Sequence, residues 1–269
     1  MSRIDSFFKS LSQKGEKKRK ALIPYLTVGY PSVAATLEVA PALVAGGCDI
    51  IELGIPFSDP LADGATIQRA SHRALQQGVT PQVCLDVASK LRKMVDVPLI
   101  FMSYYNPILH YGLEDFCAAS SQAGIDGMIV PDLPPEEGAA LEDLASRKQM
   151  DIIYLLAPTT TNKRLRLIAD RSRGFIYVVS LKGVTGARET LPPELESFIT
   201  RVRNVTAKPL CVGFGIASPE QAYRVASLAD GVIIGSRILD IVENSDQPAT
   251  AAEQFIRQVR KALSPYEPT

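Results

Sequence analysis

The stretch DIIELGIPFSDPLADG (residues 49–64) begins as an apolar, β-rich run and ends as a loop of acidic residues and prolines. Similar apolar runs recur at 21–29, 98–105, 127–133, 151–158, 175–181, 209–215 and 231–238. Helix-compatible segments separate many of them, at 33–47, 135–149, 162–172, 193–205 and 218–229, and a last one lies at 251–263. Strands that alternate with helices in this way pair in parallel through right-handed crossovers. The pattern predicts an α/β fold, a (β/α)8 TIM barrel, as a single domain over residues 1–269.

The N-terminal segment reads as a short helix and not as a targeting peptide. It lacks the apolar core of a signal peptide. Behind a capping Ser2, apolar residues fall at helical spacing at Ile4, Phe7, Phe8 and Leu11. We therefore expect a helix over about residues 2–14 that covers part of the core.

Composition excludes several classes of function. The 29 basic residues balance the 29 acidic ones, so no excess positive charge is available to bind nucleic acid. No apolar stretch is long enough to span a membrane. The four cysteines include no C-x-x-C pair and only two histidines accompany them, which favours reduced core thiols over a metal site. We expect a soluble protein of the cytoplasm, or of the plastid stroma for a plant source.

The alternation of side chains along the second apolar run places one glutamate on the inner face of the predicted barrel. One row of alternate residues is wholly apolar and suits the outer helices: Ile51, Leu53 and Ile55. Glu52 and Gly54 then face the barrel axis. Burial raises the pKa of a carboxyl group toward neutrality, where it can both accept and donate a proton. The alternative is a structural glutamate satisfied by an arginine or by backbone amides.

Asp63 lies in the loop that follows, near the carboxyl ends of the strands where barrels carry their chemistry. It is a second candidate for a catalytic carboxylate. The alternative for both Asp63 and Asp59 is a turn or helix-cap aspartate, which is common before glycine or at the start of a helix.

Glycine-rich motifs mark the ends of the last three apolar runs: GVTG (183–186) follows the sixth, GFG (213–215) closes the seventh and GS (235–236) closes the eighth. Glycine lets the backbone approach a ligand closely, and N–H groups at the start of a helix bind anions. The loops after the seventh and eighth strands of barrels often bind phosphate. The motifs together predict a phosphorylated substrate, although each alone is also an ordinary strand-to-helix turn.

A set of motifs in this order resembles the tryptophan synthase alpha subunit family, over about residues 20–263. The motifs are ELGIPFSDPLADGATIQRA (52–70), YYNPIL (104–109), GIDGMIVPDLPPEE (124–137), YLLAPTTT (154–161), VSLKGVTGAR (179–188), VGFGIASPEQ (212–221) and DGVIIGSRI (230–238). Two positions depart from the expected pattern, Ala65 and Lys182, and neither is catalytic.

The resemblance implies a lyase of tryptophan biosynthesis that cleaves indole-3-glycerol phosphate to indole and glyceraldehyde 3-phosphate without a cofactor or metal. By position, Glu52 matches the general acid/base and Asp63 matches the carboxylate that stabilises the charged indole ring. The implied substrate contacts are Tyr177, Thr185, Gly186, Gly213, Phe214, Gly215, Gly235 and Ser236. The expected apolar bed for indole is Leu22, Phe101, Ile129 and Ile153.

Two loops, at 56–64 and 182–194, exceed the usual strand–helix connection of about two to six residues. The resemblance implies that they close over the substrate, with Thr185 coupled to Asp63, and that they contact a beta subunit. That partner carries pyridoxal phosphate, in an alpha2beta2 heterotetramer. The alternatives are a stand-alone indole-releasing lyase, a noncatalytic activating subunit, or another phosphate-binding barrel such as an indole-glycerol phosphate synthase.

Overall fold

The computed structural model describes residues 1–12, 19–179, 193–213 and 215–264. Within these residues the strands are β1 (Ala21–Thr27), β2 (Ile51–Gly54), β3 (Leu99–Met102), β4 (Gly127–Ile129), β5 (Asp151–Ile153), β6 (Leu155–Leu156), β7 (Ile176–Val179), β8 (Leu210–Gly213) and β9 (Gly231–Ile234). The helices are α1 (Arg3–Ser12), α2 (Val33–Ala45), α3 (Ala65–Gln76), α4 (Pro81–Arg92), α5 (Tyr105–Tyr111), α6 (Leu113–Gln122), α7 (Ala139–Arg147), α8 (Asn162–Arg171), α9 (Pro193–Arg203), α10 (Pro219–Leu228), α11 (Ser236–Glu243) and α12 (Pro248–Leu263).

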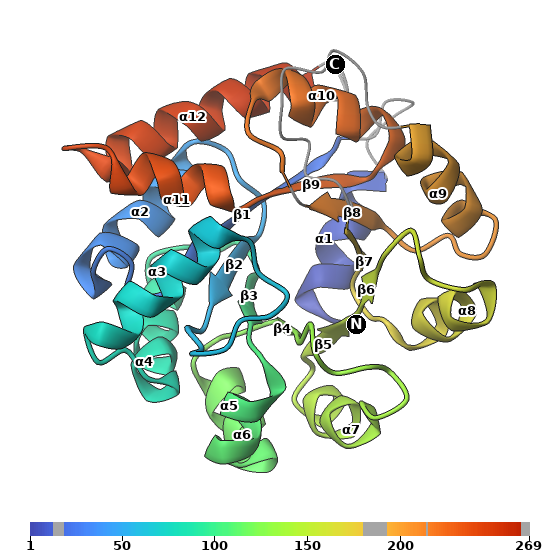
Figure 1. Ribbon diagram of the computed structural model, residues 1–269, viewed down its shortest axis with the longest axis horizontal. Helices are drawn as coiled ribbons and strands as arrows, with labels where there is room; N and C mark the ends of the chain where they lie inside the picture. Colours follow the sequence, from blue (N-terminus) through green and yellow to red (C-terminus); the bar gives the residue numbers. More distant parts are fainter. Residues whose placement is uncertain (13–18, 180–192, 214, 265–269) are drawn as a thin grey trace.

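The strands form one parallel sheet in the order β5-β4-β3-β2-β1-β9-β8-β7-β6. The two ends of this order, β5 and β6, are consecutive in the chain and are separated only by Tyr154. The Tyr177 N–H donates to the Tyr154 carbonyl at 3.1 Å, which links β7 to this break. The sheet is therefore a nearly closed barrel ringed by helices, and the predicted TIM-barrel fold is confirmed (Figure 1).

Two apolar layers make up the core. The inner layer fills the barrel with alternate strand residues such as Ile23, Ile50 and Ile100, and α1 closes one end of it with Ile4 and Phe8. The outer layer packs the other face of each strand against the helices. In β2 the outer layer takes Ile51 and Leu53, whereas Ile50 belongs to the inner layer, so the predicted parity of this strand is confirmed.

Three aspartates clamp neighbouring strands together at their N-terminal ends. Each lies just before a strand and accepts a hydrogen bond from the first or second N–H of the adjacent strand. The bonds run from Leu22, Leu99 and Leu210 to Asp49, Asp126 and Asp230, at 2.8, 2.9 and 2.9 Å. The same three aspartates pair with Arg260, Arg92 and Arg203. These ion pairs lie at the end of the barrel opposite the C-terminal strand ends, from which the loop with Asp63 emerges.

Two further observations bear on the class of protein. Among the described residues, no helix has the length and apolar character to cross a membrane. All four cysteines are free and buried, at Cys48, Cys84, Cys117 and Cys211.

Candidate active site

A cavity of about 390 Å³ opens at the C-terminal ends of the strands. Its walls come from the strand residues Tyr25, Glu52, Met102, Tyr177 and Ile233, from the start of α3 with the loop before it, and from the start of α11. Chemistry in a barrel of this kind sits at this face. Both predicted carboxylates, Glu52 and Asp63, lie in its lining.

Glu52 is completely buried at the base of this cavity. Its strand holds it in register with Tyr25 of β1 and Ile100 of β3. Neither carboxyl oxygen has a hydrogen-bond partner among the described residues. Burial without a compensating partner penalises the charged form, and it raises the pKa of Glu52 to about 8. The group is therefore protonated at neutral pH and can donate a proton.

Asp63 lines the same cavity from the loop between β2 and α3. Its backbone N–H donates to the Pro60 carbonyl at 3.0 Å, and its own carbonyl accepts a bond from the Gln68 side chain at 2.9 Å. Burial raises the pKa of the Asp63 carboxyl group to about 6, against a smaller lowering by a hydrogen bond with Tyr104. Asp63 is therefore mainly ionised at neutral pH, where Glu52 is not.

Two tyrosines reach the cavity across neighbouring glycines. A Cβ atom at Gly54 would lie 2.0 Å from the Tyr25 hydroxyl, and one at Gly213 would lie 2.2 Å from the Tyr177 hydroxyl. Gly54 thus makes room for the Tyr25 ring. Burial first, and the Glu52 and Asp63 charges after it, raise the pKa of Tyr177 well above its usual value. The phenol keeps its proton and can only act as a neutral hydrogen-bonding group.

We expect Gly54→Ala to lower the free energy of unfolding by about 1–3 kcal/mol, because the added methyl overpacks the barrel against Tyr25. Urea denaturation of Gly54→Ala, Tyr25→Ala and the double variant measures this. The double variant should lose less stability than the sum of the single variants, since removing the ring removes the clash. Strict additivity would contradict the contact.

Part of the cavity lining has the features of an anion site. Gly215, Gly235 and Ser236 all line it, and Gly215 has a φ of 77°, which favours glycine. Gly235 is the N-cap of α11 and offers no side-chain cap. The starts of α3 and α11 both border the cavity, so two positive helix ends face it. The predicted contacts Thr185, Gly186 and Phe214 lie outside the described residues.

Comparison with known proteins identifies the family of this chain. A sequence profile described as "Tryptophan synthase alpha chain" matches residues 11–265. The chain belongs to the tryptophan synthase alpha chain family. One relative, the tryptophan synthase alpha chain of Dehalococcoides mccartyi, is 53% identical over 263 residues, which cover 98% of this chain and 100% of the relative. That of Chloroflexus aggregans is 50% identical over 265 residues, which cover 97% and 98% of the two chains.

Solved structures support the same assignment to the tryptophan synthase alpha chain family. The crystal structure of tryptophan synthase subunit alpha from Legionella pneumophila superposes with a TM-score of 0.91 at 36% identity, covering 98% of this chain and 99% of that one. A chain of Mycobacterium tuberculosis tryptophan synthase gives a TM-score of 0.89 at 36% identity, covering 97% and 98%. The resemblance inferred from the motifs is confirmed.

The expected apolar bed for indole is wrong at two of its four positions. Leu22 and Phe101 belong to the outer layer, where they pack toward the helices and away from the barrel interior. Ile129 and Ile153 belong to the inner layer, as expected, but they lie outside the lining of the cavity.

The apolar lining consists of residues that the sequence did not single out for the indole bed: Tyr25, Ile67, Met102, Ile216 and Ile233. The register of the sheet, which the sequence alone does not show, places Tyr25 opposite Glu52 and so on the same face of the barrel.

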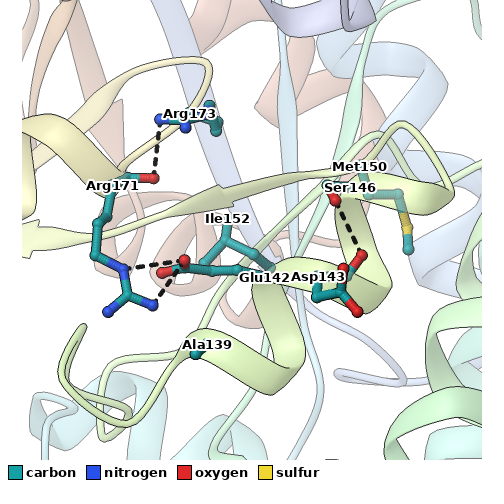
Figure 2. Close-up of a pocket in the computed structure, with 8 residues that line it drawn as sticks. All are labelled: Ala139, Glu142, Asp143, Ser146, Met150, Ile152, Arg171 and Arg173. Atoms are coloured by element: carbon teal, nitrogen blue, oxygen red, sulfur yellow. Dashed lines mark hydrogen bonds and ion pairs between the residues drawn. The ribbon is translucent and has the colours of Figure 1, made fainter.

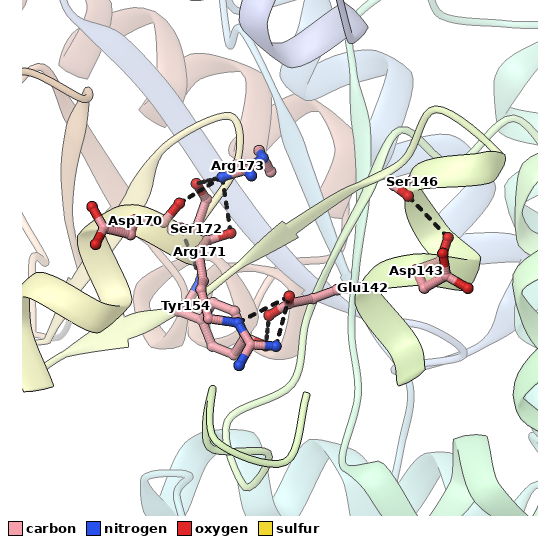
Figure 3. A network of polar contacts seen from close by, with 8 residues as sticks. All are labelled: Glu142, Asp143, Ser146, Tyr154, Asp170, Arg171, Ser172 and Arg173. Atoms are coloured by element: carbon pink, nitrogen blue, oxygen red, sulfur yellow. Dashed lines mark hydrogen bonds and ion pairs between the residues drawn. The ribbon is translucent and has the colours of Figure 1, made fainter. Parts of the chain in front are cut away.

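A second hollow, of about 310 Å³, lies outside the barrel beside α7 (Figure 2). Glu142 is its central charge. It accepts bonds from the Arg171 Nη2 atom at 2.7 Å and from the Tyr154 hydroxyl at 2.5 Å, and Arg173 donates to the Asp170 carbonyl at 2.7 Å (Figure 3). This network joins α7 to the end of α8 at the break between β5 and β6. We interpret it as a structural clasp, because Glu142 is already paired with Arg171 and Arg173 is bonded to backbone carbonyls.

Proposed function

We propose that this chain, as one barrel domain over residues 1–269, cleaves indole-3-glycerol phosphate to indole and glyceraldehyde 3-phosphate. The observation that carries the proposal is the pair of carboxyl groups in one cavity with different pKa values, about 8 for Glu52 and about 6 for Asp63. Two carboxyl groups whose environments separate their pKa values can act as acid and as carboxylate at the same pH.

The carbon–carbon cleavage needs one proton in and one proton out. Glu52 donates its proton to C3 of the indole ring, which leaves a cationic ring whose N–H points to the Asp63 carboxylate. The Glu52 carboxylate then takes the proton of the side-chain hydroxyl group. The O–H electrons form the aldehyde carbonyl, and the electrons of the broken carbon–carbon bond return to the ring. Glu52 recovers the state in which it began.

The remaining residues of the cavity hold the substrate in this scheme. Met102, Ile67 and Ile233 supply apolar contacts for the indole ring, beside the Tyr25 and Tyr177 rings. The phosphate group binds at the other end, at Gly215, Gly235 and Ser236, where the N–H groups that begin α11 favour an anion. Because the ring and the phosphate are held apart, the bond to be broken lies over Glu52.

Proton transfers to and from the chain's own carboxyl groups suffice for this carbon–carbon cleavage, so it calls for no cofactor in this chain. The indole product is apolar and small enough to escape from an open cavity, which gives a physical reason for a partner that consumes it. We propose that partner to be a tryptophan synthase beta subunit with pyridoxal phosphate, in an alpha2beta2 assembly in the cytoplasm. The family to which the chain belongs supports this, since an alpha chain implies another subunit.

The proposal is tested by the rate of indole release from indole-3-glycerol phosphate, with and without a beta subunit. We expect slow release by the purified chain and a sharp rise with the partner. Fast release that the partner does not change would indicate a stand-alone lyase. No release under either condition, with glycerol 3-phosphate still bound in calorimetry, would contradict the catalytic role and leave a phosphate-binding subunit.

A further inference from the structure

The loop that carries Asp63 is fastened to the barrel by Tyr104. The Ala62 N–H, one residue before Asp63, donates to the Tyr104 hydroxyl oxygen at 2.8 Å. The Tyr104 ring also stacks on Phe57, at the other end of the same loop, with 5.2 Å between ring centroids and 29° between planes. One side chain therefore contacts the loop at both ends.

Tyr104 is itself held rigidly at the end of β3. It is buried, and the Ser103 N–H before it donates to the Ile129 carbonyl of β4 at 3.0 Å. The Tyr105 N–H after it donates to the Asp132 carboxylate at 2.9 Å. The two flanking peptide groups are thus tied to β4 and to the residues after it, so the phenol occupies a fixed position relative to the sheet.

The Tyr104 hydroxyl oxygen accepts the Ala62 N–H, which leaves its own proton to be donated. A side-chain hydrogen bond with Tyr104 lowers the pKa of the Asp63 carboxyl group, whose Oδ1 atom is buried and has no hydrogen-bond partner among the described residues. Other titratable groups also face Asp63: the Asp63 charge contributes to the raised pKa of Tyr25 and of Tyr177. Arg237 and Asp240 of α11 line the same cavity.

We propose that Tyr104 is a positioning residue for Asp63, which fixes the loop through Ala62 and holds the carboxylate toward the substrate ring through its O–H. The expected effect on indole release rests on the proposed function, whereas the expected effect on the loop and on the Asp63 carboxylate does not. The backbone anchor and the carboxylate contact come from a single hydroxyl group. Removing that group affects both at once and leaves the ring stack on Phe57 in place.

The direct test is the titration of Asp63 by the carboxyl carbon signal in NMR, in the wild-type chain and in Tyr104→Phe, with Asp63→Asn to assign the signal. The phenylalanine ring keeps the stacking surface, so the fold is retained. We expect the midpoint to rise by roughly one pH unit in Tyr104→Phe, because a hydrogen bond to the charged form has been lost. An unchanged midpoint would overturn the proposal, and this measurement does not depend on catalysis.

The kinetic test measures kcat and KM for indole release. We expect Tyr104→Phe to lower kcat roughly tenfold with KM within about threefold, and to move the acid limb of the pH profile upward with the Asp63 midpoint. The matched control is Tyr111→Phe, which loses a tyrosine hydrogen bond to Gln82 at the C-terminal end of α5, the helix that begins just after Tyr104. Equal loss in both variants, without a shifted acid limb, would overturn the positioning role.

Discussion

We expect Glu52→Gln to lower kcat for indole release by about 10²- to 10⁴-fold, the range typical of removing a general acid/base. The amide has nearly the shape of the protonated carboxyl group, so the cavity and its packing are retained. It has no proton of comparable acidity to donate to C3 and cannot take the hydroxyl proton afterwards. Steady-state kinetics of indole release measure the loss.

Binding separates this explanation from a folding defect. We expect Glu52→Gln to bind indole-3-glycerol phosphate with an affinity close to that of the wild type, by isothermal titration calorimetry. Loss of binding together with turnover would mean that Glu52 holds the cavity in shape instead of transferring protons. Normal turnover would refute its catalytic role.

The same substitution changes the pH dependence of stability. Burial raises the pKa of Glu52 from its ordinary 4.5 to about 8 in the folded chain. The folded chain therefore keeps a proton that the unfolded chain loses, and the free energy of unfolding falls as the pH rises between these two values. The shift in pKa limits this loss in the free energy of unfolding to at most about 5 kcal/mol. Glu52→Gln cannot ionise, and urea denaturation should show it to be more stable than the wild type at pH 9 and similar at pH 4.

Asp63→Asn is expected to lower kcat by about 10²- to 10³-fold, because the amide is neutral and no longer stabilises the cationic ring. Steady-state kinetics at pH 7 measure this loss. Asp59→Asn is the matched control: Asp59 is exposed in the same loop and is bonded by Ser58 at 2.6 Å. Equal effects of the two substitutions would mean that the loop, and not the Asp63 charge, matters for turnover.

Much of the fold could be predicted because each strand is an apolar run and each is bounded by turn residues. The break at Tyr154 could not be predicted, since the fifth run (151–158) is continuously apolar after Asp151 and the break depends on the pairing with β7. Proline is disfavoured inside a central strand because it has no N–H to donate, yet Pro24 lies inside β1.

Glu52 could be predicted from the sequence because it is the one charged residue in the apolar strand β2. Its position shows which alternate residues of β2 face the barrel interior and which face the helices. No charge fixes the parity of β1 or β3, where both faces are buried and nearly every residue is apolar. Leu22 and Phe101 were therefore assigned to the wrong face. Which residues of β1 and β3 face the barrel interior follows only from the strand register, in which Glu52 lies opposite Tyr25 of β1 and Ile100 of β3.

The pH dependence of kcat for indole release tests the division of roles between the two carboxyl groups most directly. Asp63 must be ionised and Glu52 protonated, so we expect a bell-shaped profile with limbs near pH 6 and pH 8. A substrate phosphate also titrates at about pH 6. The acid limb is therefore compared with that of Asp63→Asn, which should lack the part that is due to the Asp63 carboxyl group. A rate that stays constant from pH 7 to pH 9.5 would contradict a protonated Glu52 as the acid.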